Sequence, residues 1–80
     1  MNTYKLQYFS LIGDLTGKSA EDLNSSSSTP KELYAELQKL YSFEQDPSKF
    51  RVAVNDEFTA WNTELKDGDS IVFIPPVAGG

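Results

Sequence analysis

The chemistry that this sequence offers lies at its C-terminal end. Gly79 and Gly80 have no side chains, and no charged side chain occurs from Ser70 onward. Pro75 and Pro76 lack the N–H groups that a paired strand donates, so the last strand should stop before them and the backbone should stay extended. A neutral, extended arm can enter a narrow channel, and glycines at its tip let the terminal carboxylate approach a reactive centre closely. The Gly80 carboxylate is therefore the first candidate for a reacting group.

Side chains suited to catalysis are missing or scattered. The 80 residues contain no cysteine and no histidine, which excludes disulfides, thiolate nucleophiles and Ser–His or Cys–His pairs. Two carboxylate pairs, Glu32 with Glu36 and Asp67 with Asp69, are close in sequence. No apolar pocket is predicted around either pair to raise a carboxyl pKa, so we interpret both as solvated surface.

The segment GDLTGKS, residues 13–19, resembles a phosphate-binding loop but fails its spacing. Three residues separate its glycines, whereas the motif needs four and a parallel βαβ core around it. We predict instead a short helix over the preceding apolar residues. Ser10 would cap this helix, and Gly17 would end it in the left-handed conformation.

Composition limits the partners. The formal net charge is −5, and binding to nucleic acid or to an anionic membrane depends on clustered Lys and Arg, so neither partner is expected. No apolar stretch approaches the roughly 20 residues needed to span a bilayer. The N-terminal residues MNTYKLQYF lack the pattern of a signal peptide. We therefore expect one cytoplasmic domain.

The first third of the chain is partly legible. Residues 4–9 alternate tyrosines and a leucine with polar residues and predict a strand. Residues 18–28 end in the serine run Ser25–Ser28 and are predicted as a loop on composition, with a polar edge strand over residues 20–25 as the alternative.

One amphipathic helix is clearly predicted next. Residues 29–32, TPKE, form a capping box in which Thr29 accepts from the N–H of Glu32 and the Glu32 side chain reaches back to Thr29. Pro30 occupies the first helical position, where its missing donor is harmless. An apolar stripe predicts a helix to about residue 42, and its members are Leu33, Leu37, Leu40 and Tyr41.

The second half reads as strands joined by tight turns. FRVAV, residues 50–54, alternates with its apolar residues inward, and NDE, residues 55–57, is typical of a turn. Residues 58–61 would return as a short strand. After the turn KDGD, residues 66–69, the β-prone SIVFI at residues 70–74 predicts the last strand.

Together these elements predict an α+β domain of residues 1–74, with one helix across a small sheet, followed by an extended tail of residues 75–80. Phe58 and Trp61 are predicted either as core or as partner contacts, because their spacing fits both.

The second half also carries a specific resemblance. VNDEF and LKDGDSIVFIPPVAGG, together with the opening YFSLIGDLTG, resemble the small subunits of molybdopterin synthase, a family of ubiquitin-like β-grasp sulfur carriers. The resemblance implies a mixed four- to five-stranded sheet, one main helix packed across it, a last strand beside the first, and a flexible Gly-Gly tail. Two features depart from the family: Gly13 replaces a basic residue that members often carry, and the serine run occupies the second strand.

The resemblance also implies a chemistry. A separate E1-like activating enzyme would use ATP and magnesium to adenylate the Gly80 carboxylate, and a sulfur donor protein would displace AMP to leave a thiocarboxylate. The sulfur would then pass to cyclic pyranopterin monophosphate in molybdenum cofactor biosynthesis. This chain would bind no cofactor itself. It would be the sulfur-donating subunit of an enzyme whose catalytic side chains lie in a large subunit, with two small subunits on a dimer of large ones.

The resemblance assigns the remaining site residues to the tail and to partner binding. These residues are Gly79, Ala78, Val77, Pro76, Pro75, Ile74, Phe58 and Phe9. The alternatives are a carrier for thiamine synthesis or tRNA thiolation, a protein modifier joined to lysines through Gly80, and a β-grasp interaction module with an unreactive end. Thiamine-pathway carriers are typically shorter and lack the P-P-V sequence before the glycines.

Overall fold

The structure is a computed structural model that describes residues 1–75. The predicted site residues Pro76, Val77, Ala78, Gly79 and Gly80 lie outside the described residues. In chain order the elements are β1 (Asn2–Tyr8), α1 (Ser10–Thr16), β2 (Ala20–Ser25), α2 (Pro30–Tyr41), the 3-10 turn η1 (Pro47–Lys49), β3 (Arg51–Val54), β4 (Glu57–Thr59) and β5 (Ser70–Ile74).

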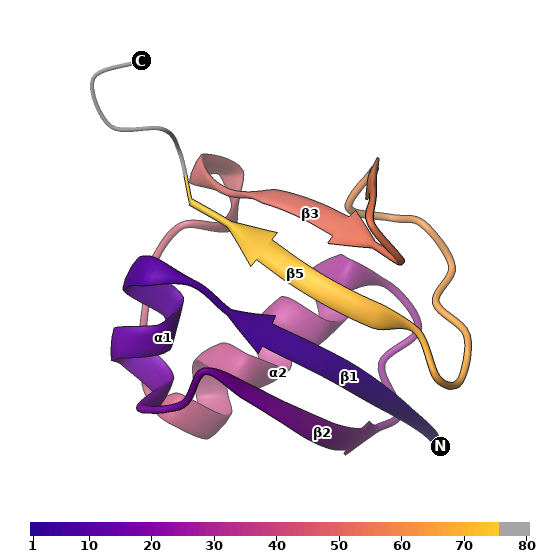
Figure 1. Ribbon diagram of the computed structural model, residues 1–80, viewed down its shortest axis with the longest axis horizontal. Helices are drawn as coiled ribbons and strands as arrows, with labels where there is room; N and C mark the ends of the chain where they lie inside the picture. The colour runs from indigo at the N-terminus through magenta and orange to yellow at the C-terminus, as the bar shows by residue number, and fades with distance from the viewer. Residues whose placement is uncertain (76–80) are drawn as a thin grey trace.

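The five strands form one mixed sheet in the order β2-β1-β5-β3-β4. β1 and β5 run parallel, and the other neighbouring pairs are antiparallel. Helix α2 lies across one face of the sheet, behind it in Figure 1, and we call the face toward the viewer the open face. The predicted α+β arrangement is confirmed, with the last strand beside the first.

The core lies between the two central strands and α2. Leu6 of β1 pairs with Ile71 of β5, and Tyr8 pairs with Phe73 two residues further on. All four side chains are buried, because alternate residues of a strand face the same side and this side is covered by the helix. β5 is thus held between two neighbouring strands and covered on one face by α2.

Helix α2 begins as predicted, with one change in its cap. The Thr29 hydroxyl accepts from the N–H of Glu32 at 3.2 Å, and Pro30 stands at the first helical position. The Glu32 carboxylate accepts from the N–H and hydroxyl of Ser28, at 2.8 and 3.0 Å, one residue before the partner that the capping box predicts. The serine run therefore contributes to the helix start.

The predicted buried face of α2 is partly wrong. Leu33 and Leu37 are fully buried and Tyr41 packs against the core, but Leu40 is 55% exposed and Tyr34, which the stripe left out, is 1% exposed. Successive helical residues are rotated by about 100°. The buried arc therefore runs from Leu33 through Leu37 to Tyr34, and Leu40 falls on the other side of Leu33.

Tyr34 is the aromatic centre of the core. Its ring lies 5.3–5.8 Å, between centroids, from four aromatic rings, those of Phe43, Phe50, Trp61 and Phe73. Its hydroxyl donates to the carbonyl of Gln45 at 2.8 Å, which satisfies the polar end of a buried ring. Burial raises the pKa of Tyr34 to about 12, and the nearby Asp46 charge adds to this.

The loop predicted for residues 18–28 is wrong over residues 20–25, which form β2, and the alternative of a polar edge strand over these residues is confirmed. β2 is an edge strand paired antiparallel to β1 from Asn2↔Ser25 onward. The Ser25 side chain is buried, and its hydroxyl donates to the Glu36 carboxylate of α2. The polar sequence of β2 has little strand propensity of its own, and pairing with β1 stabilises it as a strand.

Two other boundaries differ from prediction. α1 has Phe9 at its N-cap, without a side-chain cap hydrogen bond, so Ser10 is not the cap. Its C-cap, Gly17, has the expected left-handed φ of 73°. The returning strand spans Glu57–Thr59 rather than residues 58–61, after a turn in which Asn55 and Asp56 both have positive φ.

Candidate functional site

The base of the tail is the end of β5. Ile74 is the last residue of the strand and pairs with Arg51 of β3. The strand stops immediately before Pro75, as the missing proline donors predict. Ile74 and Pro75 are both partly buried. The point from which the tail leaves is therefore set by the sheet itself.

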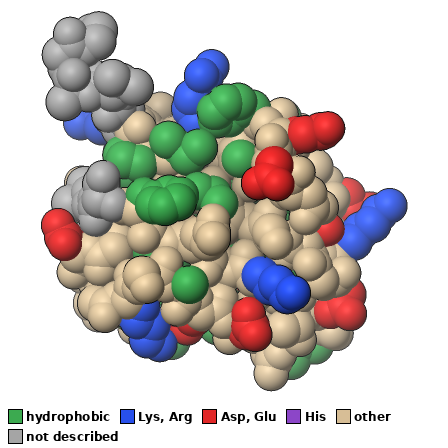
Figure 2. All heavy atoms as spheres, in the orientation of Figure 1, with side chains coloured by type: hydrophobic (Ala, Val, Ile, Leu, Met, Phe, Trp, Pro, Cys, Tyr) green, Lys and Arg blue, Asp and Glu red, His purple; other side chains and the backbone are tan. Residues whose placement is uncertain are grey.

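Apolar side chains gather on the open face around this point. Ala53 of β3 pairs with Val72 on one side and with Phe58 on the other, so the three side chains lie in one row across the sheet. Ile74 lies on the same face, and Phe58 is 62% exposed. Figure 2 shows the apolar surface on the open face. We call Phe9, Ala53, Phe58, Val72 and Ile74 the open-face patch.

The predicted partner-binding residues converge on this patch to different degrees. Phe58 and Ile74 share one face of adjoining strands. Phe9 follows β1 directly after the buried Tyr8, and it is 52% exposed at the end of the sheet where β5 stops. Their role in binding a partner stays a prediction, and so do the roles assigned to residues 75–80.

Phe58 and Trp61, for which the sequence left two readings, separate in the structure. The Trp61 ring stacks on Phe73 at 5.6 Å between centroids and with 12° between ring planes, and it meets Tyr34 edge-on. Trp61 is therefore partly buried and packs against the core. Phe58 remains on the open face.

Sequence reasoning missed Arg51. Its guanidinium lies over the Phe58 ring, with Cζ 4.9 Å from the ring centroid. The alternation of FRVAV does place Arg51 outward. Alternation does not reveal which residues of β4 and β5 lie beside Arg51, because that depends on how the strands pair.

Two turns at the opposite end of β5 hold its start in place. The Asn55 amide donates to the Asp69 carboxylate at 3.0 Å, and the Asn55 side-chain oxygen accepts from the N–H of Ser70 at 3.0 Å. The N–H of Lys66 donates to Asp69 at 2.8 Å. Gly68 has a φ of 87°, which a residue with a side chain adopts only with strain. These motif residues act on the fold and set the start of β5.

The carboxylate pairs considered from the sequence serve as hydrogen-bond acceptors within the fold. Glu32 caps α2, and Glu36 accepts from hydroxyls of the Ser25–Ser28 run. Asp67 accepts from a backbone N–H of β1 at 2.7 Å, and Asp69 closes its turn. Each of the four carboxylates therefore has a structural role, and none of them needs to be explained as part of an acid–base pair.

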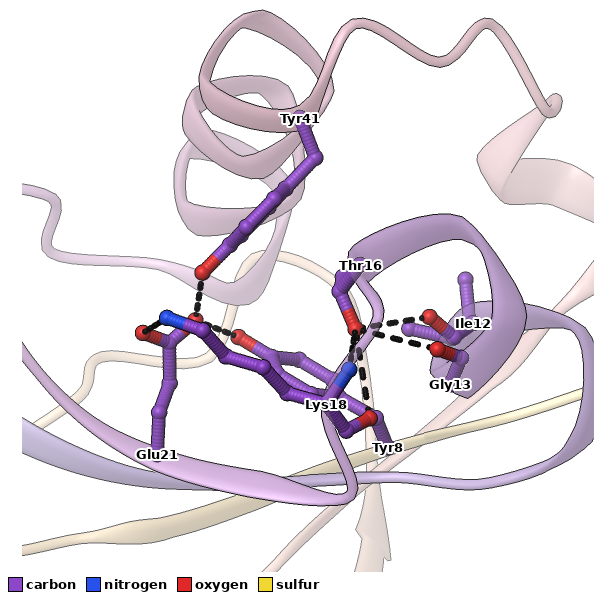
Figure 3. A network of polar contacts seen from close by, with 7 residues as sticks. All are labelled: Tyr8, Ile12, Gly13, Thr16, Lys18, Glu21 and Tyr41. Carbon is purple, nitrogen blue, oxygen red and sulfur yellow. Dashed lines mark hydrogen bonds and ion pairs between the residues drawn. The ribbon is translucent and has the colours of Figure 1, made fainter.

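A second polar cluster lies on the α2 side of the sheet (Figure 3). The Glu21 carboxylate accepts from the hydroxyls of Tyr8 and Tyr41, and it forms an ion pair with Lys18 at 3.2 Å. The cluster joins β1, β2 and the last turn of α2. It faces away from the open-face patch, because Tyr8 belongs to the buried face of β1.

The pKa values of this cluster move in the directions that favour its hydrogen bonds. Burial, followed by the hydrogen bond to Glu21, raises the pKa of Tyr8. The same two causes raise the pKa of Tyr41, in that order. Burial tends to raise the pKa of Glu21, but hydrogen bonds from Tyr41, Tyr8 and Lys18 together outweigh it and hold this pKa below its usual value. The cluster is thus a structural joint of neutral tyrosines around one carboxylate.

The glycine-containing segment of residues 13–19 is occupied by its own contacts. The Thr16 hydroxyl bonds back to the carbonyl of Ile12 at 3.0 Å, and the Lys18 ammonium is held by Glu21. The predicted helix stop at Gly17 is confirmed.

Two further properties concern residues 1–75. Within this part of the chain, no group of three or more acidic, histidine or cysteine side chains is placed to hold a metal ion. The helices described there are too short or too polar to cross a membrane.

Comparison with known proteins adds family information to this geometry. A family model described as the ThiS family matches residues 6–80. The molybdopterin synthase sulfur carrier subunit of Escherichia coli (strain K12) is 28% identical over 79 residues, which cover 95% of this chain and 98% of that protein.

Solved structures show the same fold. A putative molybdopterin converting factor, subunit 1, from Pyrococcus furiosus aligns with a TM-score of 0.81 and 28% identity, over 96% of this chain and all of the other. A chain of the protein–protein complex of subunits 1 and 2 of the molybdopterin-converting factor from Helicobacter pylori aligns with a TM-score of 0.67 and 29% identity, over 98% of this chain and 99% of the other. SAMP1 from Haloferax volcanii aligns with a TM-score of 0.79 at 19% identity, over 99% of this chain and all of the other. This last likeness concerns the fold alone, and together the matches confirm the ubiquitin-like β-grasp architecture.

Proposed function

Because this chain belongs to the ThiS family, we propose that it is a sulfur carrier that works through the carboxylate of Gly80. An activating enzyme of the E1 type joins this carboxylate to the AMP part of ATP, with magnesium, and releases pyrophosphate. A sulfur donor protein then supplies sulfur at the oxidation level of sulfide, which attacks the acyl carbon, displaces AMP and leaves a thiocarboxylate on Gly80. The finer proposal is that this sulfur goes to cyclic pyranopterin monophosphate in molybdenum cofactor biosynthesis.

The observation that carries this proposal is the placement of the tail base. β5 lies between β1 and β3, its side chains Ile71 and Phe73 are fully buried, and it ends directly before Pro75 beside the open-face patch, in which Phe9 and Phe58 are exposed. A rigid base allows a partner that docks on the patch to receive the tail in a defined direction. Such docking lowers the entropy cost of bringing a terminal carboxylate to a distant active site.

The partner that accepts the sulfur is, in this proposal, a large subunit of molybdopterin synthase. The 29% identity to a chain of the Helicobacter pylori complex of subunits 1 and 2 supports this assignment. The sequence of this chain contains neither cysteine nor histidine, so the large subunit supplies the catalytic side chains. We further propose the assembly of two small subunits on a dimer of large ones, in the cytoplasm, where ATP is at hand.

A protein modifier joined to lysines through Gly80 is the alternative that shares the activation step. The likeness to SAMP1 shows the same fold at low identity and does not identify the acceptor. The alternatives differ in the final bond: a modifier ends in an isopeptide, whereas a carrier ends in a transferred sulfur.

The first test is the intact mass of the protein after incubation with ATP, a sulfur source and extract of its host. We expect one oxygen-to-sulfur exchange that fragmentation localises to Gly80. A matched control variant lacks Gly79 and Gly80. It should fold equally well and show no exchange, because its terminal carboxylate belongs to Ala78 and no longer follows two glycines.

A second arm supplies the large subunit and cyclic pyranopterin monophosphate to the thiolated protein. We expect the thiocarboxylate of Gly80 to return to a carboxylate, with the mass of the unmodified protein, while the pterin gains sulfur. An unchanged mass in an extract that thiolates a known carrier would contradict the carrier role. Lysine-linked adducts of Gly80 without pterin thiolation would favour the modifier.

A further inference from the structure

Arg51 lies beside the point where β5 ends. It is the first residue of β3 and pairs with Ile74, the last residue of β5. Because Ala53 pairs with both Phe58 and Val72, Arg51 lies on the same face as these residues, two positions away along β3. The cation therefore borders the open-face patch at the very point where β5 ends.

Within residues 1–75 the guanidinium of Arg51 contacts an aromatic ring and no carboxylate. It lies over Phe58 at 4.9 Å from Cζ to the ring centroid. Within residues 1–75 the ion pair that forms is Lys18 with Glu21, so Arg51 has no acidic partner within 4.0 Å there. Stacking uses the flat face of a guanidinium and leaves its edge N–H groups available, and these fit the two oxygens of a carboxylate.

The charges around the patch are asymmetric. The chain has twelve acidic and seven basic residues, yet the adjoining strands β3 and β5, RVAV and SIVFI, contain no acidic residue. Two acidic residues lie away from the end of β5: Asp22 pairs with Lys5 across β2 and β1, and Asp56 lies in the turn after β3. A positive site within apolar surface on an acidic protein selects a complementary surface that is apolar and carries a negative charge.

We propose that Arg51 determines specificity in docking, by binding a carboxylate of the large subunit while Phe58 and Ile74 fill apolar surface beside it. This inference rests on the proposed function, since it takes the large subunit as the occupant of the patch. Arg and aromatic residues are enriched at protein interfaces, and a stacked guanidinium loses less freedom on binding than an unrestrained one. Arg51 acts by positioning the tail and does not touch the reacting atoms.

The test compares charge variants with a matched control. Arg51→Gln removes the charge, Arg51→Glu reverses it, and Arg51→Lys keeps it but loses the planar fork. Lys31→Glu makes the same change in net charge as Arg51→Glu, at an exposed position of α2 on the other side of the sheet. The probe is the large subunit from the same host, titrated calorimetrically with the full chain at low and high salt. Equal thermal midpoints for all variants would confirm that each one is folded.

We expect Arg51→Gln to raise the Kd roughly tenfold, Arg51→Glu to raise it further, and Arg51→Lys to lie between Arg51→Gln and the unchanged protein. The Kd of Lys31→Glu should change less than about threefold, as is usual for a charge outside an interface. High salt should weaken the unchanged protein more than Arg51→Gln.

The outcomes separate this inference from the proposed function. If the unchanged chain binds the large subunit and Arg51→Glu behaves like Lys31→Glu, the inference on Arg51 is wrong while the proposed function stands. If the unchanged chain is thiolated at Gly80 but does not bind the large subunit, the assignment of the partner is wrong and the inference is lost with it. A failure to thiolate Gly80 at all would count against the proposed function independently of Arg51.

Discussion

At the scale of single residues, Asn55 shows that a residue of a recognisable motif can act purely on the fold. It has a φ of 53°, and its side chain links the turn after β3 to the start of β5 through Asp69 and Ser70. Asn tolerates this left-handed conformation better than most residues with a side chain. The residue therefore combines a turn conformation with a lock on the neighbouring strand.

Two substitutions separate these two contributions. Asn55→Gly keeps a backbone that accepts positive φ but removes both side-chain hydrogen bonds, and we expect a loss of about 1–2 kcal/mol in the free energy of unfolding. Asn55→Ala should lose about 1 kcal/mol more, because alanine is strained at this φ. Urea denaturation measures both values. Sulfur transfer per folded molecule should stay unchanged, and a loss of transfer at full folding would assign Asn55 a contact with a partner instead.

At the scale of elements, the phase of α2 decides which of its leucines stabilise the protein. The buried arc is centred between Leu33 and Tyr34, since both of these residues and Leu37 are buried. Leu40 continues the heptad-like spacing but is 55% exposed near the C-terminal end of the helix. Apolar spacing alone thus overestimates the stripe by one residue.

The same substitution at two leucines tests this phase. Leu37→Ala opens a cavity in the core, and we expect a loss of about 2–5 kcal/mol in the free energy of unfolding. Leu40→Ala removes mostly exposed surface and should change this free energy by no more than about 0.5 kcal/mol. Thermal or urea unfolding of the two variants gives the comparison. Similar losses at both positions would show that Leu40 is covered in solution.

The elements also show what a sequence of this kind reveals. β5 and the start of α2 were predictable, because SIVFI and TPKE are strong local signals. β2 was predictable only as an alternative to a loop, because the polar sequence AEDLNS becomes a strand through its pairing with β1. The stacking of Arg51 on Phe58 was invisible, since it joins residues of two strands whose register only the fold determines. The chemistry of Gly80 was predicted from its residue type and its family resemblance, and it rests on the same grounds now.

At the scale of the whole molecule, the two faces of the sheet have different tasks. The face under α2 holds the aromatic core around Tyr34 and the joint around Glu21, and these contacts provide stability. The open face carries Phe58 and Arg51 in exposed positions beside the end of β5. Changes on the open face should therefore alter partner binding more than stability, whereas changes on the α2 face should do the reverse.

The dependence of stability on pH is a property of the whole chain, and it should show a broad plateau through neutral pH. There is no histidine to titrate there. The carboxyl groups whose pKa values the fold lowers are Glu21, Glu32 and Asp46. The tyrosines whose pKa values it raises are Tyr8, Tyr34 and Tyr41. All of these groups titrate toward the extremes of the scale.

The sign of each contribution follows from where the proton binds. A carboxyl group with a lowered pKa in the folded state stabilises the fold above the usual value, near 4.5 for Glu, and this contribution is lost as the pH falls. A tyrosine with a raised pKa stabilises the fold below the usual value of 10.0, and this contribution is lost as the pH rises, through about 12 for Tyr34. We therefore expect a nearly constant Tm between about pH 5 and 9, with a fall on both sides.

Glu21→Gln tests the acid side of this profile against Glu64→Gln, which makes the same change in charge at an exposed position. Glutamine at position 21 cannot ionise, so the Tm of this variant should start lower on the plateau and fall less steeply between about pH 5 and 3 than that of the unchanged protein. The Glu64→Gln profile should follow the unchanged protein. Circular dichroism melts across the pH range measure all three curves. Parallel acid slopes for Glu21→Gln and the unchanged protein would mean that the two tyrosine hydroxyls do not favour the charged form of Glu21. The joint between β1, β2 and α2 would then have to be held by packing of the Tyr8 and Tyr41 rings, which meet edge-on at 6.5 Å between centroids.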